Sequence, residues 1–362
     1  QKIYKDYLTQ KIEQAPRLTK MVFLENPVGL FRFFPDKTRH FAAEWVGWSD
    51  LSDISFFETS SGKLINKDTL PGGIRWAKFS DDGKLLYTLA GPRTVTVWDA
   101  PQGKILHTFD KHSGWIGSQV GVATDNNQLA VPVRGFKTGV AVWDLKTGNE
   151  SFPFLETDHH CLSATFSKDG RFLAGTTGGF RGNSDYGVVY VWALHPNNQP
   201  ELKHQIEIGK PVHMVDFNPL HNSFVIACGN LNSENAPFYA QTFDAETGQS
   251  ISEKMSHSSA VLHAKFSPDG QWVLTGSYDG TAQTWDAKTG SSISTSMAHE
   301  GSIYSVNFSP DGALVATASA DNTARVWEAK TGQPVTPPLL HLNGVNDASF
   351  DSVARTVTTA SR

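Results

Sequence analysis

A repeat of 42 residues constrains this chain more than any other feature of its sequence. Trp285 and Trp327 are 42 residues apart, and so are Phe266 and Phe308, and Phe308 and Phe350. Around these markers, Phe-Ser-Pro-Asp-Gly and Trp-Asp/Glu-Ala-Lys-Thr-Gly return at constant offsets in the last third of the chain. Short apolar or alternating runs separate these turn sequences, as expected for strands. The period predicts repeated small sheets, each of which buries both of its faces only by stacking against its neighbours.

The turns of each unit contain the residues that tight hairpins require. In the seventh unit, Gly312 follows Pro-Asp and Gly332 follows Lys-Thr. Glycine adopts a positive φ without steric cost, so both positions suit a sharp reversal between antiparallel strands. Four strands joined by such turns form one unit, and closing the units into a ring limits the number of exposed sheet edges.

These markers resemble the WD (tryptophan–aspartate) repeat family. The resemblance implies an all-β fold, a beta-propeller of seven or eight four-stranded blades. It is strong in units six and seven and looser in units one, three and five, where Phe57 or Phe243 replaces the Trp, or the turn sequence differs. An eighth unit begins at His341 and continues to Phe350 and beyond, so both blade counts stay open, with eight slightly favoured.

In the WD family a His, a Ser or Thr, an Asp and a Trp of one unit form a structural hydrogen-bonded chain. The matching residues here are His257, Ser277, Asp279 and Trp285 in the sixth unit, and His299, Ser319, Asp321 and Trp327 in the seventh. A His–Ser–Asp trio also suggests a catalytic triad. The same trio occurs in two consecutive repeats, which favours a building unit, and we predict no catalytic residues. The loss of the Asp turn in the first five units puts the hydrogen-bonded chain there in doubt.

Composition sets further limits. The net charge of −5 is spread over 362 residues without long runs, so nothing indicates a nucleic-acid or membrane surface. No apolar run approaches the 18 residues of a membrane span. The chain has only two cysteines, Cys161 and Cys228, which favours a reducing compartment and a cytoplasmic location.

The organisation of the chain follows from where the repeat holds. Residues 1–24 do not match it, and we expect an N-terminal extension or linker there, either frayed or docked as a helix. A strand at residues 21–24 could close the ring. Residues 25–362 are expected to form the propeller, with the last blade incomplete, as part of a larger protein with flanking domains.

Three long or unusual loops suggest where partners bind. They occupy residues 133–139, 178–187 and 229–237, between the second and third strands of units three, four and five. In WD propellers such loops lie on the face that commonly binds partners. Aromatic and Arg side chains are enriched in binding hot spots, and the candidates here are Trp115, Arg134, Phe136, Phe180, Arg181, Tyr186 and Tyr278. The alternative is that these loops fold back and bury their own aromatic side chains.

Two functional classes remain open. The first is a non-enzymatic scaffold or sensor that binds protein or peptide partners on the loop face, without a cofactor. The second is an enzymatic propeller, because the Asp-Ala-Lys-Thr-Gly turn also resembles quinoprotein dehydrogenases. The Trp that follows the Gly in those enzymes is absent after Gly290 and Gly332, which disfavours this class. A metal site at His112, His159, His160 and His213 is also disfavoured, since adjacent residues of a strand point to opposite faces and no Cys or carboxylate spacing supports it.

Overall fold

The computed structural model describes a chain built of β-strands. It describes residues 28–33, 39–45, 51–58, 61, 63–80, 82–91, 93–110, 114–123, 127–178, 186–195, 199–231, 237–350 and 356–361. This part of the chain contains 31 strands and no helix, and therefore no helix long and apolar enough to cross a membrane.

The first four sheets are antiparallel, and their strands follow one another in sequence order, except that β9 of the third sheet pairs with β11. The first sheet consists of β1 (Val28–Phe33), β2 (Arg39–Trp45), β3 (Leu51–Glu58) and β4 (Leu64–Pro71). The second consists of β5 (Ile74–Phe79), β6 (Leu85–Ala90), β7 (Thr94–Asp99) and β8 (Lys104–Phe109). The third consists of β9 (Trp115–Ile116), β10 (Gly121–Ala123), β11 (Gln128–Arg134), β12 (Gly139–Asp144) and β13 (Leu155–Glu156). The fourth consists of β14 (Cys161–Phe166), β15 (Phe172–Thr177), β16 (Val188–Ala193) and β17 (Glu201–Glu207).

The remaining sheets repeat this plan. The fifth consists of β18 (Val212–Phe217), β19 (Ser223–Cys228), β20 (Tyr239–Asp244) and β21 (Met255–Ser256). The sixth consists of β22 (Val261–Phe266), β23 (Trp272–Ser277), β24 (Thr281–Asp286) and β25 (Met297–Ala298). The seventh consists of β26 (Ile303–Phe308), β27 (Leu314–Ser319), β28 (Thr323–Glu328) and β29 (Leu339–Leu340). The eighth consists of β30 (Val345–Phe350) and β31 (Val357–Ser361).

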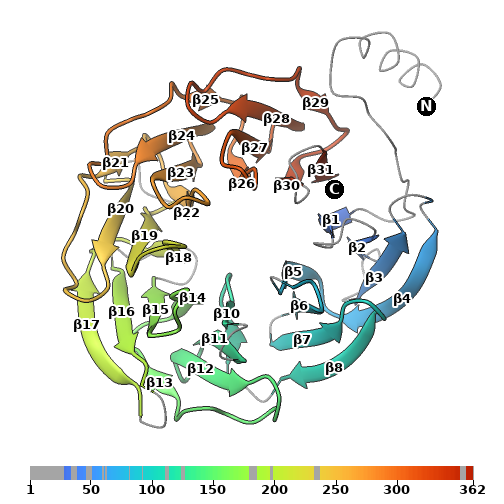
Figure 1. Cartoon of the computed structure of the whole chain (residues 1–362), viewed down its shortest axis with the longest axis vertical. Helices are drawn as coiled ribbons and strands as arrows, with labels where there is room; N and C mark the ends of the chain where they lie inside the picture. The colour runs from blue at the N-terminus through green and yellow to red at the C-terminus, as the bar shows by residue number, and fades with distance from the viewer. Residues whose placement is uncertain are drawn as a thin grey trace.

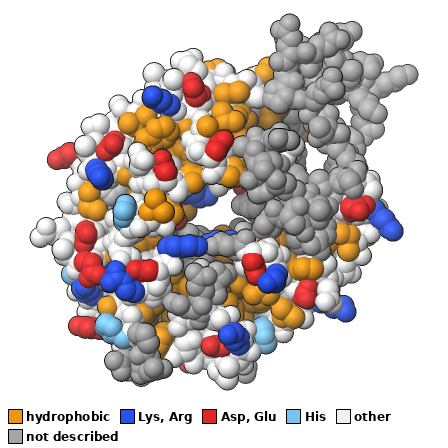
Figure 2. Space-filling view, in the orientation of Figure 1, with side chains coloured by type: hydrophobic (Ala, Val, Ile, Leu, Met, Phe, Trp, Pro, Cys, Tyr) orange, Lys and Arg blue, Asp and Glu red, His pale blue; other side chains and the backbone are white. Residues whose placement is uncertain are grey.

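The sheets stand around a central opening (Figure 1 and Figure 2). The first strand of each sheet is innermost, except that β10 takes this place in the third sheet. Strand β1 lies against β30 and β31, so the two ends of the described chain meet in the ring. Residues 345–350 form an inner strand of that ring. These features confirm the expectation of an all-β propeller. The strand expected at residues 21–24 lies outside the described residues.

The Phe-Ser-Pro-Asp-Gly turn has a specific hydrogen-bond pattern that explains why it recurs. In the seventh sheet, Ser309 Oγ donates to Asp311 Oδ1 at 2.5 Å, and the Leu314 amide donates to Ser309 Oγ at 2.9 Å. Gly312 closes the turn with a φ of 73°. The Ser, Asp and Gly residues of the second, fourth and sixth sheets make the same contacts. The motif therefore predicts the β-turn between first and second strands wherever it occurs.

The hydrophobic core is divided into layers, one between each pair of neighbouring sheets. One layer joins the fourth and fifth sheets through Phe172, Val191, Phe224 and Phe243, among others. Separate layers join the other neighbours from the first sheet to the eighth. Since each sheet is apolar on both faces, a single sheet would not be stable alone, and the ring is the smallest arrangement that buries every face.

Candidate partner-binding face

Two kinds of segment share one face of the ring, which we call the loop face. These are the turns between second and third strands and the segments that connect successive sheets. Asp279, in a turn of the sixth sheet, accepts a hydrogen bond from the Ser258 amide at 2.9 Å. Ser302, in the connection to the seventh sheet, donates to the Tyr278 carbonyl at 3.0 Å. The turns with the Phe-Ser-Pro-Asp-Gly sequence lie at the other ends of the same strands and define the opposite face.

The third sheet presents an exposed aromatic and cationic group on the loop face. Trp115 pairs with Arg134 across β9 and β11, and the Arg134 guanidinium lies 5.8 Å from the centre of the Trp115 ring. Trp115 is 45% exposed and Phe136 is fully exposed. Burial lowers the pKa of Arg134 from its ordinary value. A partly desolvated guanidinium stacked on an indole forms a cation–π pair, which a partner could extend with its own apolar or acidic groups.

Two glycines allow this group to form. Gly135 has a φ of 147°, a conformation that other residues rarely adopt. A Cβ atom on Gly114 would lie 2.4 Å from the Arg134 carbonyl oxygen. The close approach of these two backbones places Trp115 beside Arg134, and the positive φ of Gly135 turns Phe136 outward.

Histidines link this group to the fourth sheet. The ring centres of His159 and Tyr186 are 3.9 Å apart. Burial lowers the pKa of His160, and the positive charges of Arg134 and His159 lower it further. Arg134 is therefore close enough to His160 for the two charges to interact, and His159 contacts Tyr186. Sequence reasoning weighed His159 and His160 only as metal ligands, although their place just before the first strand of a unit could have indicated the loop face.

Tyr278 belongs to a different part of the loop face. It is 47% exposed in the turn of the sixth sheet. Two further exposed side chains of the loop face were not predicted from the sequence. Tyr304 in the seventh sheet is 40% exposed, and Leu342 before the eighth is 85% exposed. Tyr304 is the second residue of β26, and Leu342 lies in the segment between β29 and β30; no repeat marker singles out either residue. Apolar exposure therefore continues around the loop face, outside the predicted loops.

The remaining predicted residues give a mixed result. Phe180 and Arg181, with Gly179 and Gly182, lie outside the described residues. Gly178, the first residue of the predicted loop 178–187, does not take a positive φ. Its role is close packing, because a Cβ atom there would lie 2.8 Å from Leu162 Cδ1 and 3.0 Å from Pro211 Cβ.

The hydrogen-bonded chains differ from the expectation in one member. In the seventh sheet, Trp327 Nε1 donates to Thr317 Oγ1 at 2.8 Å, and His299 Nε2 lies 2.7 Å from the same hydroxyl. His299 Nδ1 lies 2.9 Å from Asp321. Ser319 is outside this chain, because its hydroxyl donates to the Gly301 carbonyl and accepts from the Asp321 amide.

The sixth sheet has the same arrangement. Thr275, and not Ser277, joins Trp285 to His257, with distances of 2.8 Å and 2.7 Å. Residues two apart on a strand share a face, so the sequence placed the hydroxyl on the correct side but at the wrong position. Ser277 instead donates to the carbonyls of Ser259 and Ala260.

Part of the hydrogen-bonded chain also persists in the second sheet, which lacks the Asp turn, and in the eighth sheet. Trp98 Nε1 donates to Thr88 Oγ1 at 2.9 Å in the second sheet. His341 Nε2 lies 2.9 Å from Thr359 Oγ1 in the eighth. The doubt raised for the second unit therefore applies to its His and Asp members and does not extend to the Trp–Thr bond.

The His–Thr–Asp sets are closed to a substrate. The side chain of His257 is 2% exposed and that of His299 is 0% exposed, and both ring nitrogens of each are within hydrogen-bond distance of protein groups. A nucleophile or base must be able to reach its substrate. Within the described part of the chain, no three His, Cys, Asp or Glu side chains come together in a way that could hold a metal ion.

Comparisons with known proteins agree with this geometry. Residues 248–286 and 290–328 each match the family model "WD domain, G-beta repeat". The chain is 25% identical over 215 residues to eukaryotic translation initiation factor 3 subunit I of Kluyveromyces lactis, covering 57% of this chain and 58% of that protein. It is 25% identical over 233 residues to the serine-threonine kinase receptor-associated protein of Dictyostelium discoideum, covering 63% and 71%. The C-terminal WD40 domain of Sif2 superposes with a TM-score of 0.75 and 16% identity, covering 96% of each chain.

Proposed function

Because the chain is a β-propeller that contains WD repeats, we propose that it is a non-enzymatic scaffold that binds a protein or peptide partner on its loop face. The observation that carries the proposal is the fully exposed Phe136 beside the Trp115–Arg134 pair. Aromatic side chains have few rotatable bonds, so they lose little conformational entropy when a partner buries them. Trp, Tyr and Arg also dominate the energetics of known interfaces.

The relatives support this class of function without naming the partner. One is a subunit of a translation initiation factor, and another is described as receptor-associated. Both names refer to assembly with other proteins. The matched region spans about 60% of the initiation-factor subunit, and the proposal is limited to the class of partner.

The side chains of the loop face indicate which kind of peptide would bind. Lys137 follows Phe136 in the same exposed loop, and Arg134 lies next to Trp115. A peptide with an apolar anchor flanked by carboxylates would match this combination of aromatic and cationic groups. Since burial of the anchor supplies most of the affinity, salt should weaken binding only moderately. We also propose a reducing, cytoplasmic location, supported by two buried cysteines that are both free thiols.

The test is a selection from a displayed peptide library against the parent protein, followed by affinity measurements on two matched double variants. Trp115→Ser with Phe136→Ser removes the aromatic group of the loop face. Leu106→Ser with Leu202→Ser removes comparable exposed apolar side chains from β8 and β17, at the rim of the ring, where each is 47% exposed. The first variant should lose at least tenfold in affinity for selected peptides, about 1.4 kcal/mol.

The rim variant is expected to bind like the parent. Equal binding by all three proteins would show that the exposed aromatic side chains of the third sheet have no role in recognition. Unfolding midpoints of the three proteins establish that any loss of binding reflects the surface and not the fold.

A further inference from the structure

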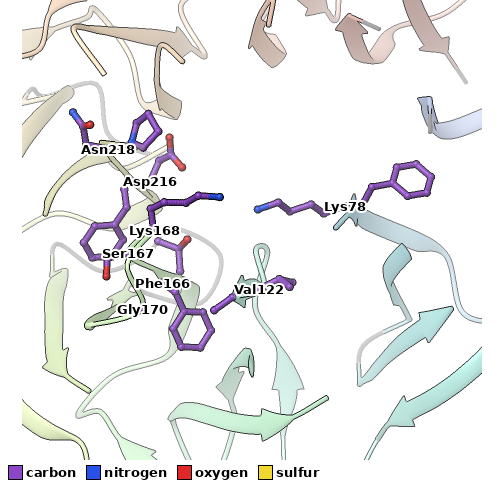
Figure 3. A pocket seen from close by; sticks show the side chains of 13 residues that line it. Lys78, Val122, Phe166, Ser167, Lys168, Gly170, Asp216 and Asn218 are labelled. Carbon is purple, nitrogen blue, oxygen red and sulfur yellow. The ribbon is translucent and has the colours of Figure 1, made fainter. Parts of the chain in front are cut away.

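The face opposite the loop face contains two adjoining cavities around the central opening. One has a volume of about 170 Å³ and the other about 350 Å³, and they share Asp216, Phe217 and Pro219. Figure 3 shows the first cavity, whose lining residues come from the second, third, fourth and fifth sheets. The second continues past the sixth and seventh sheets to Phe350 of the eighth. We call the two together the channel mouth.

The repeat itself determines which residues line the channel mouth. The residue immediately before the Phe of the inner strand lines it in five sheets; these residues are Lys78, Thr165, Asp216, Lys265 and Asn307. The family motif does not specify this position, and in this chain it holds two lysines and one aspartate. A third lysine, Lys168, reaches the first cavity from the turn between β14 and β15.

The charge of the channel mouth is positive although the protein is negative. Among the described residues that line it, the charged ones are Lys78, Lys168, Lys265 and Asp216. These give three positive charges against one carboxyl group, in a chain whose net charge is −5. A positive cluster of this kind attracts anions, and does so more strongly between low-dielectric walls.

The arrangement of the lysines concentrates this charge. The side chains of Lys78 and Lys168 extend toward one another from opposite sides of the opening (Figure 3). Lys265 Nζ donates to Asn307 Oδ1 at 2.7 Å in the adjoining cavity.

Asp216 is the one carboxyl group among the described residues that line the channel mouth. Its Oδ2 accepts a hydrogen bond from the Phe266 amide at 3.0 Å. Burial raises the pKa of Asp216, and the hydrogen bond and the nearby lysines compensate only in part. The carboxyl group is therefore less readily charged than one at the surface.

We propose that the channel mouth binds a small multivalent anion, with two or more phosphate or carboxylate groups bridging Lys78 and Lys168 and with Lys265 adding charge from the adjoining cavity. An anion between the two ammonium groups would replace their mutual repulsion by two attractions. The aromatic and proline residues of the inner-strand turns, among them Phe166, Phe217 and Pro219, form the surrounding wall. The site lies at the opposite end of the strands from the loop face and is independent of the proposed peptide binding.

Titration calorimetry on the whole chain tests this proposal, with pyrophosphate, citrate and inorganic phosphate as probes. Pyrophosphate or citrate should bind saturably at one site per chain, and inorganic phosphate more weakly; which of the two binds more tightly identifies phosphate or carboxylate as the preferred group. Lys78→Met and Lys168→Met should each weaken binding by about tenfold, because each removes one of the bridging charges. Lys288→Met is the matched control, since Lys288 is an exposed lysine in the outer turn of the sixth sheet.

Three results would overturn the site: no saturable binding to the parent, equal weakening by Lys288→Met, or binding unchanged in both channel variants. Asp216→Asn adds a test of sign, because removal of the carboxyl group should tighten anion binding. If that variant instead loses binding, the anion model is wrong. The bound anion should also raise the melting temperature of the parent and of Lys288→Met, but not that of the channel variants.

Discussion

The seventh and fifth sheets have side chains of opposite polarity at equivalent buried positions. In the seventh, Trp327 and Thr317 form a polar chain with His299 and Asp321. In the fifth, the strand register places Phe243 where Trp327 stands and Ile226 where Thr317 stands. Ile208 lies 18 residues before Ile226, as His299 lies 18 before Thr317.

The difference shows that the polar chain is replaced as a set. Phe243 and Ile226 belong to the apolar layer between the fourth and fifth sheets, and Ile208 packs against it. Removing one member of a buried hydrogen-bonded set leaves its partners unsatisfied, whereas replacing all of them by apolar groups can be close to neutral. The two sheets therefore represent two self-consistent states, and single substitutions in either should be unfavourable.

The largest effect is expected for Trp327→Ala compared with Phe243→Ala. Trp327 is 4% exposed and Phe243 is 5% exposed, so both substitutions leave a cavity and should cost about 3–5 kcal/mol. The loss at Trp327 should be the larger, because it also removes the donor to Thr317. Urea unfolding of the two variants measures the difference. A greater loss at Phe243 would mean that the polar chain adds nothing beyond packing.

A hydroxyl exchange at the central position sharpens the comparison. Thr317→Val removes the group that Trp327 and His299 share, which should cost about 1–3 kcal/mol. Ile226→Thr buries a hydroxyl among apolar side chains and should also cost about 1–3 kcal/mol. The same chemical change in opposite directions should thus destabilise both sheets. If Ile226→Thr is neutral in thermal denaturation, the fifth sheet is not the closed apolar set described here.

This contrast also explains what could be predicted from sequence. The turns follow from Ser, Asp and Gly at fixed offsets, whose hydrogen bonds are local, and the propeller follows from their period. The linking hydroxyl was misassigned because Thr317 and Ser319 lie on the same face of one strand, and only the observed hydrogen bonds distinguish them. In the candidate site, Trp115 and Arg134 were predicted as members of one group, but the contact of His159 with Tyr186 joins residues 27 apart in sequence and depends on tertiary packing.

A pH effect should accompany the polar chain and be absent from the apolar set of Phe243, Ile226 and Ile208 that replaces it in the fifth sheet. Burial lowers the pKa of His299, an effect that its hydrogen bond and charge attraction to Asp321 only partly offset, while Arg325 lowers the pKa further. The unfolded state therefore binds a proton near pH 6.5, where the folded state does not. Stability from His299 is present above about pH 6.5 and is lost as the pH falls toward its folded pKa.

The variant His299→Gln separates this effect from other titrations. It should be less stable than the parent at about pH 7.5, but should lose less stability on acidification to about pH 5.5. Asp321 does not titrate between about pH 5.5 and 7.5, because its pKa is lowered from the ordinary value. Burial alone would raise this pKa, but hydrogen bonds from Thr323 and His299 outweigh that effect. Ile208→Gln in the fifth sheet is the control and should leave the pH dependence of the parent unchanged. An equal pH dependence in the parent and His299→Gln would assign the effect to other histidines.

The smallest difference is expected at the outer turns, where the fifth and sixth sheets share two Asp–Thr hydrogen bonds. The sixth adds a bond from the Lys288 amide to Asp286 Oδ1 at 3.0 Å. Asp244 Oδ1 accepts hydrogen bonds from the amide and hydroxyl of Thr247 at 2.8 Å and 3.1 Å. Asp286 Oδ1 accepts the same two bonds from Thr289 at 2.8 Å and 3.0 Å. The inner chemistry of these sheets differs, since the sixth has the polar chain of His257, Thr275 and Trp285.

Asp244→Ala and Asp286→Ala should therefore have similar costs, each about 0.5–1.5 kcal/mol, as expected for partly exposed turn hydrogen bonds. Equal midpoints in urea unfolding would show that the turn contributes the same stability to a sheet with the polar chain and to a sheet with the apolar set. A clearly larger loss for Asp286→Ala would mean that the turn and the polar chain are coupled through Trp285, its immediate neighbour in sequence. Combining Asp286→Ala with Thr275→Val distinguishes these outcomes. The loss of stability in the double variant equals the sum of the two single losses if the turn is independent, and differs from that sum if it is coupled.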